Sequence, residues 1–170
     1  MNNIIAQICG VIAIILTMMS VHQEEKKRVL ITQFLANIAY LIQYLCLFAW
    51  SGAAMTFLAI IRCFIFYYYD KNNKPKSVPV LIIICLLMIF CGIFTYDGLI
   101  SILPVIVAIS YSYAMWQNNM KIFRIVSIIS PVLWIIYDIY VSAFTVIVAS
   151  IFEFISAFFA VLRFDIDKKR

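Results

Sequence analysis

The sequence predicts an all-α membrane protein with seven transmembrane helices, and three observations lead to this fold class. First, 66% of the 170 residues are hydrophobic and 12% are charged, and the mean hydropathy is +1.05, whereas soluble domains are about half apolar and a quarter charged. Second, the apolar residues form seven stretches long enough to cross a bilayer core of about 30 Å. Third, apart from Arg62, Lys and Arg gather at one side of such a bundle.

The chain divides into seven expected helices and leaves no room for a flexible linker or a second domain, because it contains only four Gly and four Pro. One transmembrane domain over residues 1–170 is therefore expected. The first stretch lacks a basic start and a small-residue cleavage site, so we expect a mature helix rather than a signal peptide. Two connections are so short that they predict tight antiparallel hairpins: Trp50-Ser51 and residues 142–144. The expected helices are Asn3–Ser20, Val29–Ala49, Gly52–Tyr69, Val78–Phe94, Leu99–Met115, Ile122–Val141 and Thr145–Phe164.

The basic residues predict the orientation of the bundle. With seven spans, the connections 22–28 and 70–77, the basic pair Lys121 and Arg124 where the fifth helix connects to the sixth, and the C-terminal residues all lie on one side, and they carry the Lys and Arg residues. The connections on the other side hold no Lys or Arg. Because Lys and Arg are retained in the cytoplasm, the N-terminus is expected outside and the C-terminus in the cytoplasm. A count of six spans would break this pattern.

An internal repeat is predicted when the chain is compared with itself at an offset of 94 residues. Gly10–Asp70 then aligns without a gap with Pro104–Phe164, and Gln23 and Lys27 fall on Gln117 and Lys121. Three spans and one linking span restore the direction of insertion, so the two units run parallel. We therefore expect a 3+1+3 architecture: a three-helix unit in residues 3–76, a linker helix in 77–97 and a second unit in 98–170. Parallel repeats of this kind occur in transporters, with the solute site near the midplane between the repeats.

Four segments carry a resemblance to a known family: GVIAIILTMMSVHQEEKKR, GAAMTFLAIIRCFIF, ILPVIVAISYSYAMW and FRIVSIISPVLWIIYD. They resemble the bacterial inner-membrane YgjV family. The 3+1+3 arrangement is also similar to the wider SWEET, PnuC and PQ-loop (MtN3-like) transporter fold. The family resemblance implies a multi-pass protein of the bacterial cytoplasmic membrane and brings no assigned substrate with it.

Three ionisable residues lie inside expected spans: Arg62, Asp138 and Glu153. Each costs about 2.5–3.5 kcal/mol at the bilayer centre on insertion scales, so each should face protein or water. The repeat register brings Glu153 to a depth that the Arg62 side chain can reach, and we expect these two residues to form an ion pair between the units. Two interpretations stay open, a static lock between helices and a solute- or proton-responsive gate. Asp138 is expected near the outer mouth.

A polar and aromatic face on the second helix predicts a solute-binding cleft. Gln33, Asn37 and Tyr40 lie on one face of that helix, and Trp134 lies at the equivalent place on the sixth. Rings and amide groups suit a flat or hydroxylated small molecule. The alternative is ordinary packing, because Asn and Gln commonly form hydrogen bonds between transmembrane helices. The predicted solute-binding residues are Arg62, Glu153, Asn37, Tyr40, Trp134, Asp138 and Gln33.

These residues favour a small-solute transporter or facilitator that works by alternating access; the alternative is a non-transporting binding or accessory protein of the same fold. No enzyme is expected, because the one histidine, His22, leaves a catalytic triad without a base inside the membrane. No metal site and no cofactor are expected either, since the five cysteines form no CxxC pair. The expected partners are the lipid bilayer and a small solute, with no nucleic acid. The sequence leaves open the substrate, the coupling ion and whether the chain forms a homo-oligomer.

Overall fold

The computed structural model describes residues 2–46, 50–72, 77–94, 96, 98–140 and 144–166, and these residues are helical except at the connections. An all-α bundle is therefore confirmed. A short 3-10 turn, η1, precedes α5, and a π-helical turn, η2, follows α7. The elements are α1 (Asn2–Val21), α2 (Lys26–Cys46), α3 (Trp50–Lys71), α4 (Val78–Phe94), η1 (Leu99–Ser101), α5 (Ile102–Trp116), α6 (Met120–Tyr140), α7 (Phe144–Val161) and η2 (Leu162–Ile166).

Five of the seven α-helices in the described part of the chain, α1, α2, α3, α6 and α7, are long and apolar enough to cross a membrane. The other two, α4 and α5, are apolar but have 17 and 15 residues. The turn η1 leads directly into α5, so the helical segment from Leu99 to Trp116 is longer than α5 alone. Seven helices of this kind fit a multi-pass membrane protein.

Some predicted boundaries are wrong at the connections. Trp50 and Ser51 are the first residues of α3 rather than a link between helices. Lys26 opens α2, and Lys121 and Arg124 lie within the first two turns of α6. Charged side chains in the first turns of a helix find partners beyond the apolar run, as Lys26 and Arg124 do at the ends of neighbouring helices, so the helices extend beyond the apolar runs. The expected hairpin residues 142 and 143 lie outside the described residues.

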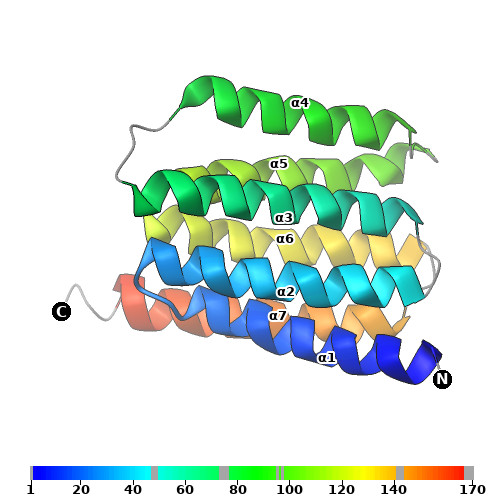
Figure 1. The fold of residues 1–170 in the computed structure, drawn as a ribbon. Coiled ribbons are helices and arrows are strands. Elements are labelled where there is room, and N and C mark those ends of the chain that lie inside the picture. The colour runs from blue at the N-terminus through cyan, green and yellow to red at the C-terminus, as the bar shows by residue number, and fades with distance from the viewer. Residues whose placement is uncertain are drawn as a thin grey trace.

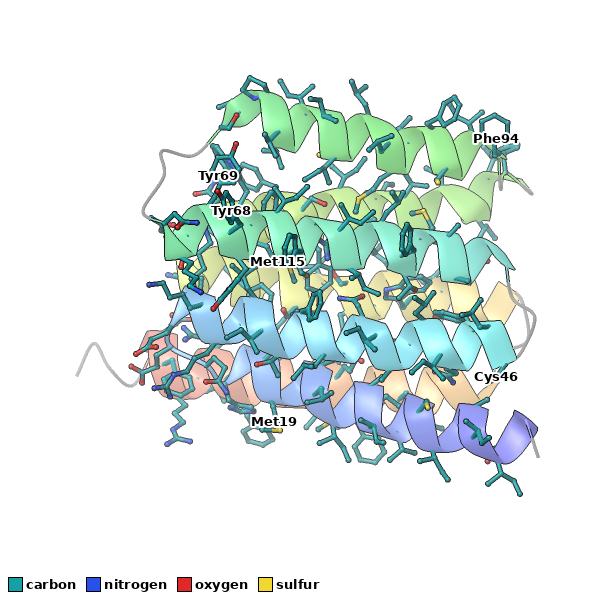
Figure 2. All side chains as sticks on the ribbon, viewed as in Figure 1. Met19, Cys46, Tyr68, Tyr69, Phe94 and Met115 are labelled. Carbon is teal, nitrogen blue, oxygen red and sulfur yellow. The ribbon has the colours of Figure 1, made fainter. Side chains whose placement is uncertain are left out.

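The seven helices lie side by side with their axes roughly aligned (Figure 1). One end of the bundle, which we call the basic end, is where α1, α3, α5 and α7 finish and α2, α4 and α6 begin. Figure 2 shows Tyr68 and Tyr69 at this end and Phe94 at the opposite end. The packed helix pairs are α1·α2, α2·α3, α3·α4, α3·α5, α4·α5, α5·α6, α6·α7, α1·α7 and, less extensively, α1·α6.

The hydrophobic core lies in the basic half of the bundle. Its buried side chains come from all seven helices, and small residues such as Ala157 and Ala160 allow α7 to approach closely. Large apolar side chains elsewhere point outward: Phe94 is 74% exposed and Ile93 is 67% exposed. Such a surface is explained by contact with lipid, in which an apolar exterior carries no penalty. Core members include Leu30, Cys63, Phe66, Met88, Met115 and Phe123.

Candidate functional site

Arg62 is buried in the middle of α3, with only 4% of its surface exposed. Its Nη1 donates hydrogen bonds to the carbonyl oxygen of Ala108 at 3.3 Å and to Oγ of Ser112 at 3.1 Å, both on α5. Ser112 Oγ donates in turn to the Ala108 carbonyl at 2.7 Å. The arginine therefore links α3 to α5 through neutral oxygen atoms.

The predicted ion pair between Arg62 and Glu153 is wrong. Among the described residues two ion pairs occur, Arg28 with Glu25 and Arg124 with Asp165, and Arg62 takes part in neither. The physical reason lies in the packing order: α3 packs against α2, α4 and α5, whereas α7 packs against α6 and α1. The repeat register predicted the depth of the two residues, but depth does not determine which helices face each other.

Glu153 instead meets the second helix. Tyr40 Oη donates a hydrogen bond to Glu153 Oε1 at 3.1 Å, which joins α2 to α7. Tyr111 on α5 is within electrostatic range of both Glu153 and Arg62, and its hydroxyl donates to Ser127 Oγ on α6 at 3.5 Å. Both charged residues thus act electrostatically on Tyr111, although they do not pair with each other.

Gln33 and Asn37 make contacts within the first three helices. Gln33 is buried and its Nε2 donates to Ser20 Oγ on α1 at 2.8 Å. Asn37 Nδ2 donates to the Gln33 carbonyl at 2.6 Å, one turn earlier on the same helix, and lies 4.0 Å from Cys63 Sγ on α3. These contacts resemble the packing alternative considered for the sequence, and a role in solute binding stays a prediction.

Trp134 and Asp138 lie on α6, one turn apart, toward the end opposite the basic end. The Trp134 ring is half-buried and meets Tyr137 edge-on, with 5.8 Å between the ring centres. The side chain of Asp138 lies outside the described part of the structure. The described contacts of Trp134 are with Tyr137 and do not include Arg62. The binding roles of Trp134 and Asp138 therefore stay predictions.

The sequence analysis missed a second buried arginine, Arg124, because it was interpreted only as a charge that sets orientation. Its Nε donates to the Val21 carbonyl at 3.2 Å and its Nη2 to the Gln23 carbonyl at 3.2 Å. Its Nη1 pairs with Asp165 Oδ1 at 3.0 Å, and its guanidinium lies 4.7 Å from the centre of the Phe164 ring. A cation at the end of α1 satisfies helix carbonyls that have no partner within the helix.

Lys26 does the same for α5. Its Nζ donates to the carbonyl of Trp116, the last residue of α5, at 3.0 Å, and to Asn118 Oδ1 at 3.2 Å. Lys26 on α2 thus binds the end of α5, and Arg124 on α6 binds the end of α1. The signal that predicts these contacts is a Lys or Arg in the first two turns of a helix, directly after a connection of only a few residues.

His22 follows α1 at the basic end. Its Nε2 lies 3.1 Å from Ser156 Oγ on α7. Partial burial lowers the pKa of His22 below its ordinary value of 6.5, and the neighbouring guanidinium groups of Arg163 and Arg124 lower this pKa further. Each of these effects disfavours the imidazolium form, so the neutral ring is the form that the folded protein stabilises.

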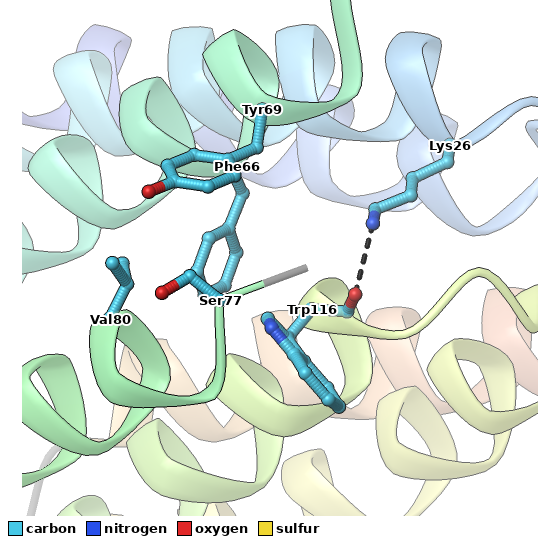
Figure 3. A pocket seen from close by; sticks show the side chains of 6 residues that line it. All are labelled: Lys26, Phe66, Tyr69, Ser77, Val80 and Trp116. Atoms are coloured by element: carbon cyan, nitrogen blue, oxygen red, sulfur yellow. Dashed lines mark hydrogen bonds between the residues drawn. The ribbon is translucent and has the colours of Figure 1, made fainter. Parts of the chain in front are cut away.

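A recess opens at the basic end between α2, α3, α4 and α5 (Figure 3). It is a shallow recess with a cavity volume of about 20 Å³, and it is partly open to solvent. Aromatic rings form much of its wall, as expected for Trp and Tyr at a membrane interface, and the Lys26 hydrogen bond to Trp116 crosses it. The lining residues are Lys26, Phe66, Tyr69, Ser77, Val80 and Trp116.

Seven apolar helices that bury polar and charged side chains at mid-span and turn Ile, Leu and Phe outward define a multi-pass α-helical membrane protein. The chain belongs to the Imp-YgjV family, described as bacterial inner membrane protein, because the family model matches residues 4–168. The chain is therefore a protein of the bacterial cytoplasmic membrane, in contact with the lipid bilayer. No curated protein and no solved structure matches it.

Proposed function

We propose that the chain is a small-solute transporter or facilitator that works by alternating access between two three-helix units, α1–α3 and α5–α7, with α4 as the linker. The observation that carries this proposal is the chemistry of the contacts between the units. At mid-span Arg62 contacts Ser112 and Tyr40 contacts Glu153, each pair joining one unit to the other. Hydrogen bonds between polar groups can be exchanged for water or solute, whereas a wholly apolar interface cannot open at low cost.

The pattern of helix packing supports a parallel repeat. Exchanging the two units maps α1·α2 onto α5·α6 and α2·α3 onto α6·α7, and it maps α1·α7 onto α3·α5; all of these pairs are packed. Units related in this way can rock against each other around a site at their interface.

Individual contacts repeat the same relation. Arg62 and Ser156 occupy equivalent positions in the two units; Arg62 contacts α5 of the second unit, and Ser156 contacts His22 beyond α1 of the first. In addition, Lys26 binds the end of α5, and Arg124 binds the end of α1. Together with the core in the basic half, these contacts join the two units at the basic end, which the positive-inside rule assigns to the cytoplasm.

Solute flux into proteoliposomes tests the proposal. The purified chain is reconstituted and compared with protein-free vesicles for uptake of labelled nucleosides, vitamins, sugars, amino acids and organic acids. A transporter gives saturable uptake of at least one class, and the same solute raises the unfolding temperature of the purified protein. If no class is taken up and none stabilises the protein, the non-transporting accessory protein of the same fold is the better account.

A further inference from the structure

The immediate surroundings of Arg62 contain no negative charge among the described residues. Its hydrogen-bond acceptors are a backbone carbonyl and a serine hydroxyl, both on α5 and both engaged through Nη1, and the neutral thiol of Cys63 interacts with the guanidinium as well. Its Nε is buried and has no hydrogen-bond partner in the part of the chain that the structure describes. A guanidinium does not lose its proton in proteins, so a full positive charge lies there beside neutral groups.

Arg124, a second buried cation in the described part of the chain, has a different set of partners. Arg124 is as buried as Arg62, at 4% exposure, but all three of its nitrogens have a partner, and one partner is the carboxylate of Asp165. Arg124 therefore illustrates a completed structural site in the same protein. Arg62, by comparison, has a buried Nε without a hydrogen-bond partner and no carboxylate partner among the described residues.

The unpaired Nε of Arg62 indicates which kind of ligand could bind there. Nε and the adjacent Nη2 form the side of a guanidinium that binds both oxygens of a carboxylate or two oxygens of a phosphate. The neighbouring groups are weakly polar or apolar: Ser112 Oγ contacts Met88 Sδ at 3.3 Å, and Cys63 Sγ lies 4.0 Å from Met115 Sδ. A single positive charge in such surroundings balances one negative charge, whereas a phosphate dianion would keep an uncompensated charge away from water.

We propose that the solute carried by this protein is a small organic monocarboxylate, and that its carboxylate binds the Nε edge of Arg62 when the contact between α3 and α5 opens. This inference rests on the transport function proposed above. The carboxylate replaces Ala108 and Ser112 as the principal acceptor, and the methionine and cysteine side chains contact the apolar part of the solute. Opening of the α3·α5 contact thereby becomes coupled to binding, because the guanidinium exchanges one set of acceptors for another.

Matched pairs of acid and amide test the charge requirement. Propionate, lactate and benzoate are compared with propionamide, lactamide and benzamide, and inorganic phosphate is included. Thermal stabilisation of the purified protein and uptake into proteoliposomes are both measured. The inference predicts that at least one carboxylate stabilises and enters, and that its amide binds roughly 10-fold more weakly or worse, since a hydrogen-bonded charge is lost.

Variants of Arg62 assign the effect to this residue. Arg62→Gln is expected to abolish the preference for acid over amide. Arg62→Lys keeps the positive charge, so this variant should fold even if Arg62→Gln does not. A lysine lacks the two adjacent N–H donors of the guanidinium, so the variant should bind the acid more weakly than the wild type and still bind it more tightly than the amide. Arg28→Gln is the matched control, because Arg28 is an arginine with a side chain 67% exposed, and it should behave like the wild type.

The outcomes separate this inference from the proposed function. Uptake of neutral solutes with the same efficiency in wild type and Arg62→Gln overturns the monocarboxylate inference and leaves the transport proposal intact. Stabilisation by a carboxylate that depends on Arg62, without uptake of any solute, overturns transport and supports the anion site. Tighter binding of phosphate than of every carboxylate contradicts the choice of a monocarboxylate.

Discussion

Removing the buried arginine at the basic end should strongly destabilise the protein. Arg124→Ala deletes hydrogen bonds to two carbonyls and an ion pair in which the side chains are 5% and 10% exposed. Breaking a buried ion pair costs about 3–5 kcal/mol. For a chain of this length about 1 kcal/mol corresponds to 2–4 °C in the unfolding midpoint, so we expect a loss of about 6–20 °C, measured by thermal unfolding in detergent.

A variant of Asp165, the ion-pair partner of Arg124, tests whether the loss comes from this pair. Asp165→Ala should destabilise less than Arg124→Ala, because the guanidinium keeps the Val21 and Gln23 carbonyls and the Phe164 ring. The double variant should resemble Arg124→Ala alone, since the two residues are coupled.

The exposed pair of the protein is the matched control. Arg28 and Glu25 are 67% and 66% exposed, and such pairs contribute less than about 1 kcal/mol. Arg28→Ala should therefore shift the midpoint by less than about 4 °C. Equal losses for Arg28→Ala and Arg124→Ala, or simple addition of the Arg124 and Asp165 effects, would refute the assignment of a buried coupled pair.

Three further predictions follow from local geometry. Because the pKa of His22 is lowered in the folded protein, the unfolded chain binds protons more readily, and stability should fall as the pH drops below 6.5; His22→Gln should flatten this pH dependence of the unfolding midpoint. A side chain at Gly92 would overlap Val105, so Gly92→Val should weaken the packing of α4 against α5. We expect faster hydrogen exchange of the backbone amides of α4, and unchanged exchange would contradict this prediction. Lys26→Met removes the bond to the Trp116 carbonyl and should lower the unfolding midpoint by a few degrees, since a charged hydrogen bond contributes about 1.5–3 kcal/mol; a midpoint equal to that of the wild type would show that water replaces this bond.

The helices could be predicted from the sequence because apolar runs in a membrane protein are long and end at polar residues. The predicted fourth helix, Val78–Phe94, agrees with α4 in both bounds. At the connections the prediction was short by a few residues, as at Lys26 and Trp50. Charged and interfacial residues in the first turn of a helix carry little hydropathy signal, so the apolar pattern does not reveal that the helix includes them.

The candidate site was predicted only in part. The burial of Arg62 followed from its place in an apolar run, and the structure confirms it. The partner of Arg62 could not be predicted from the sequence, because hydropathy gives the depth of a residue but not the packing order of the helices. Glu153 was matched to Arg62 by depth, whereas α2 brings Tyr40 to it. Arg124 was overlooked because a basic residue near a connection is typical of topology, and its burial depends on contacts with α1 and η2.

The most direct test of the central claim is the distance between the two units at both ends of the bundle, with and without solute. In a variant with the five native cysteines replaced, one pair of spin labels joins Tyr68 on α3 to Asn118 after α5 at the basic end, and another joins Ala54 to Ile102 at the opposite end; all four positions are exposed. Alternating access predicts two populations whose distances change in opposite directions at the two ends when a transported solute is added. A single distance distribution at each end, unchanged by a solute that binds, would contradict it.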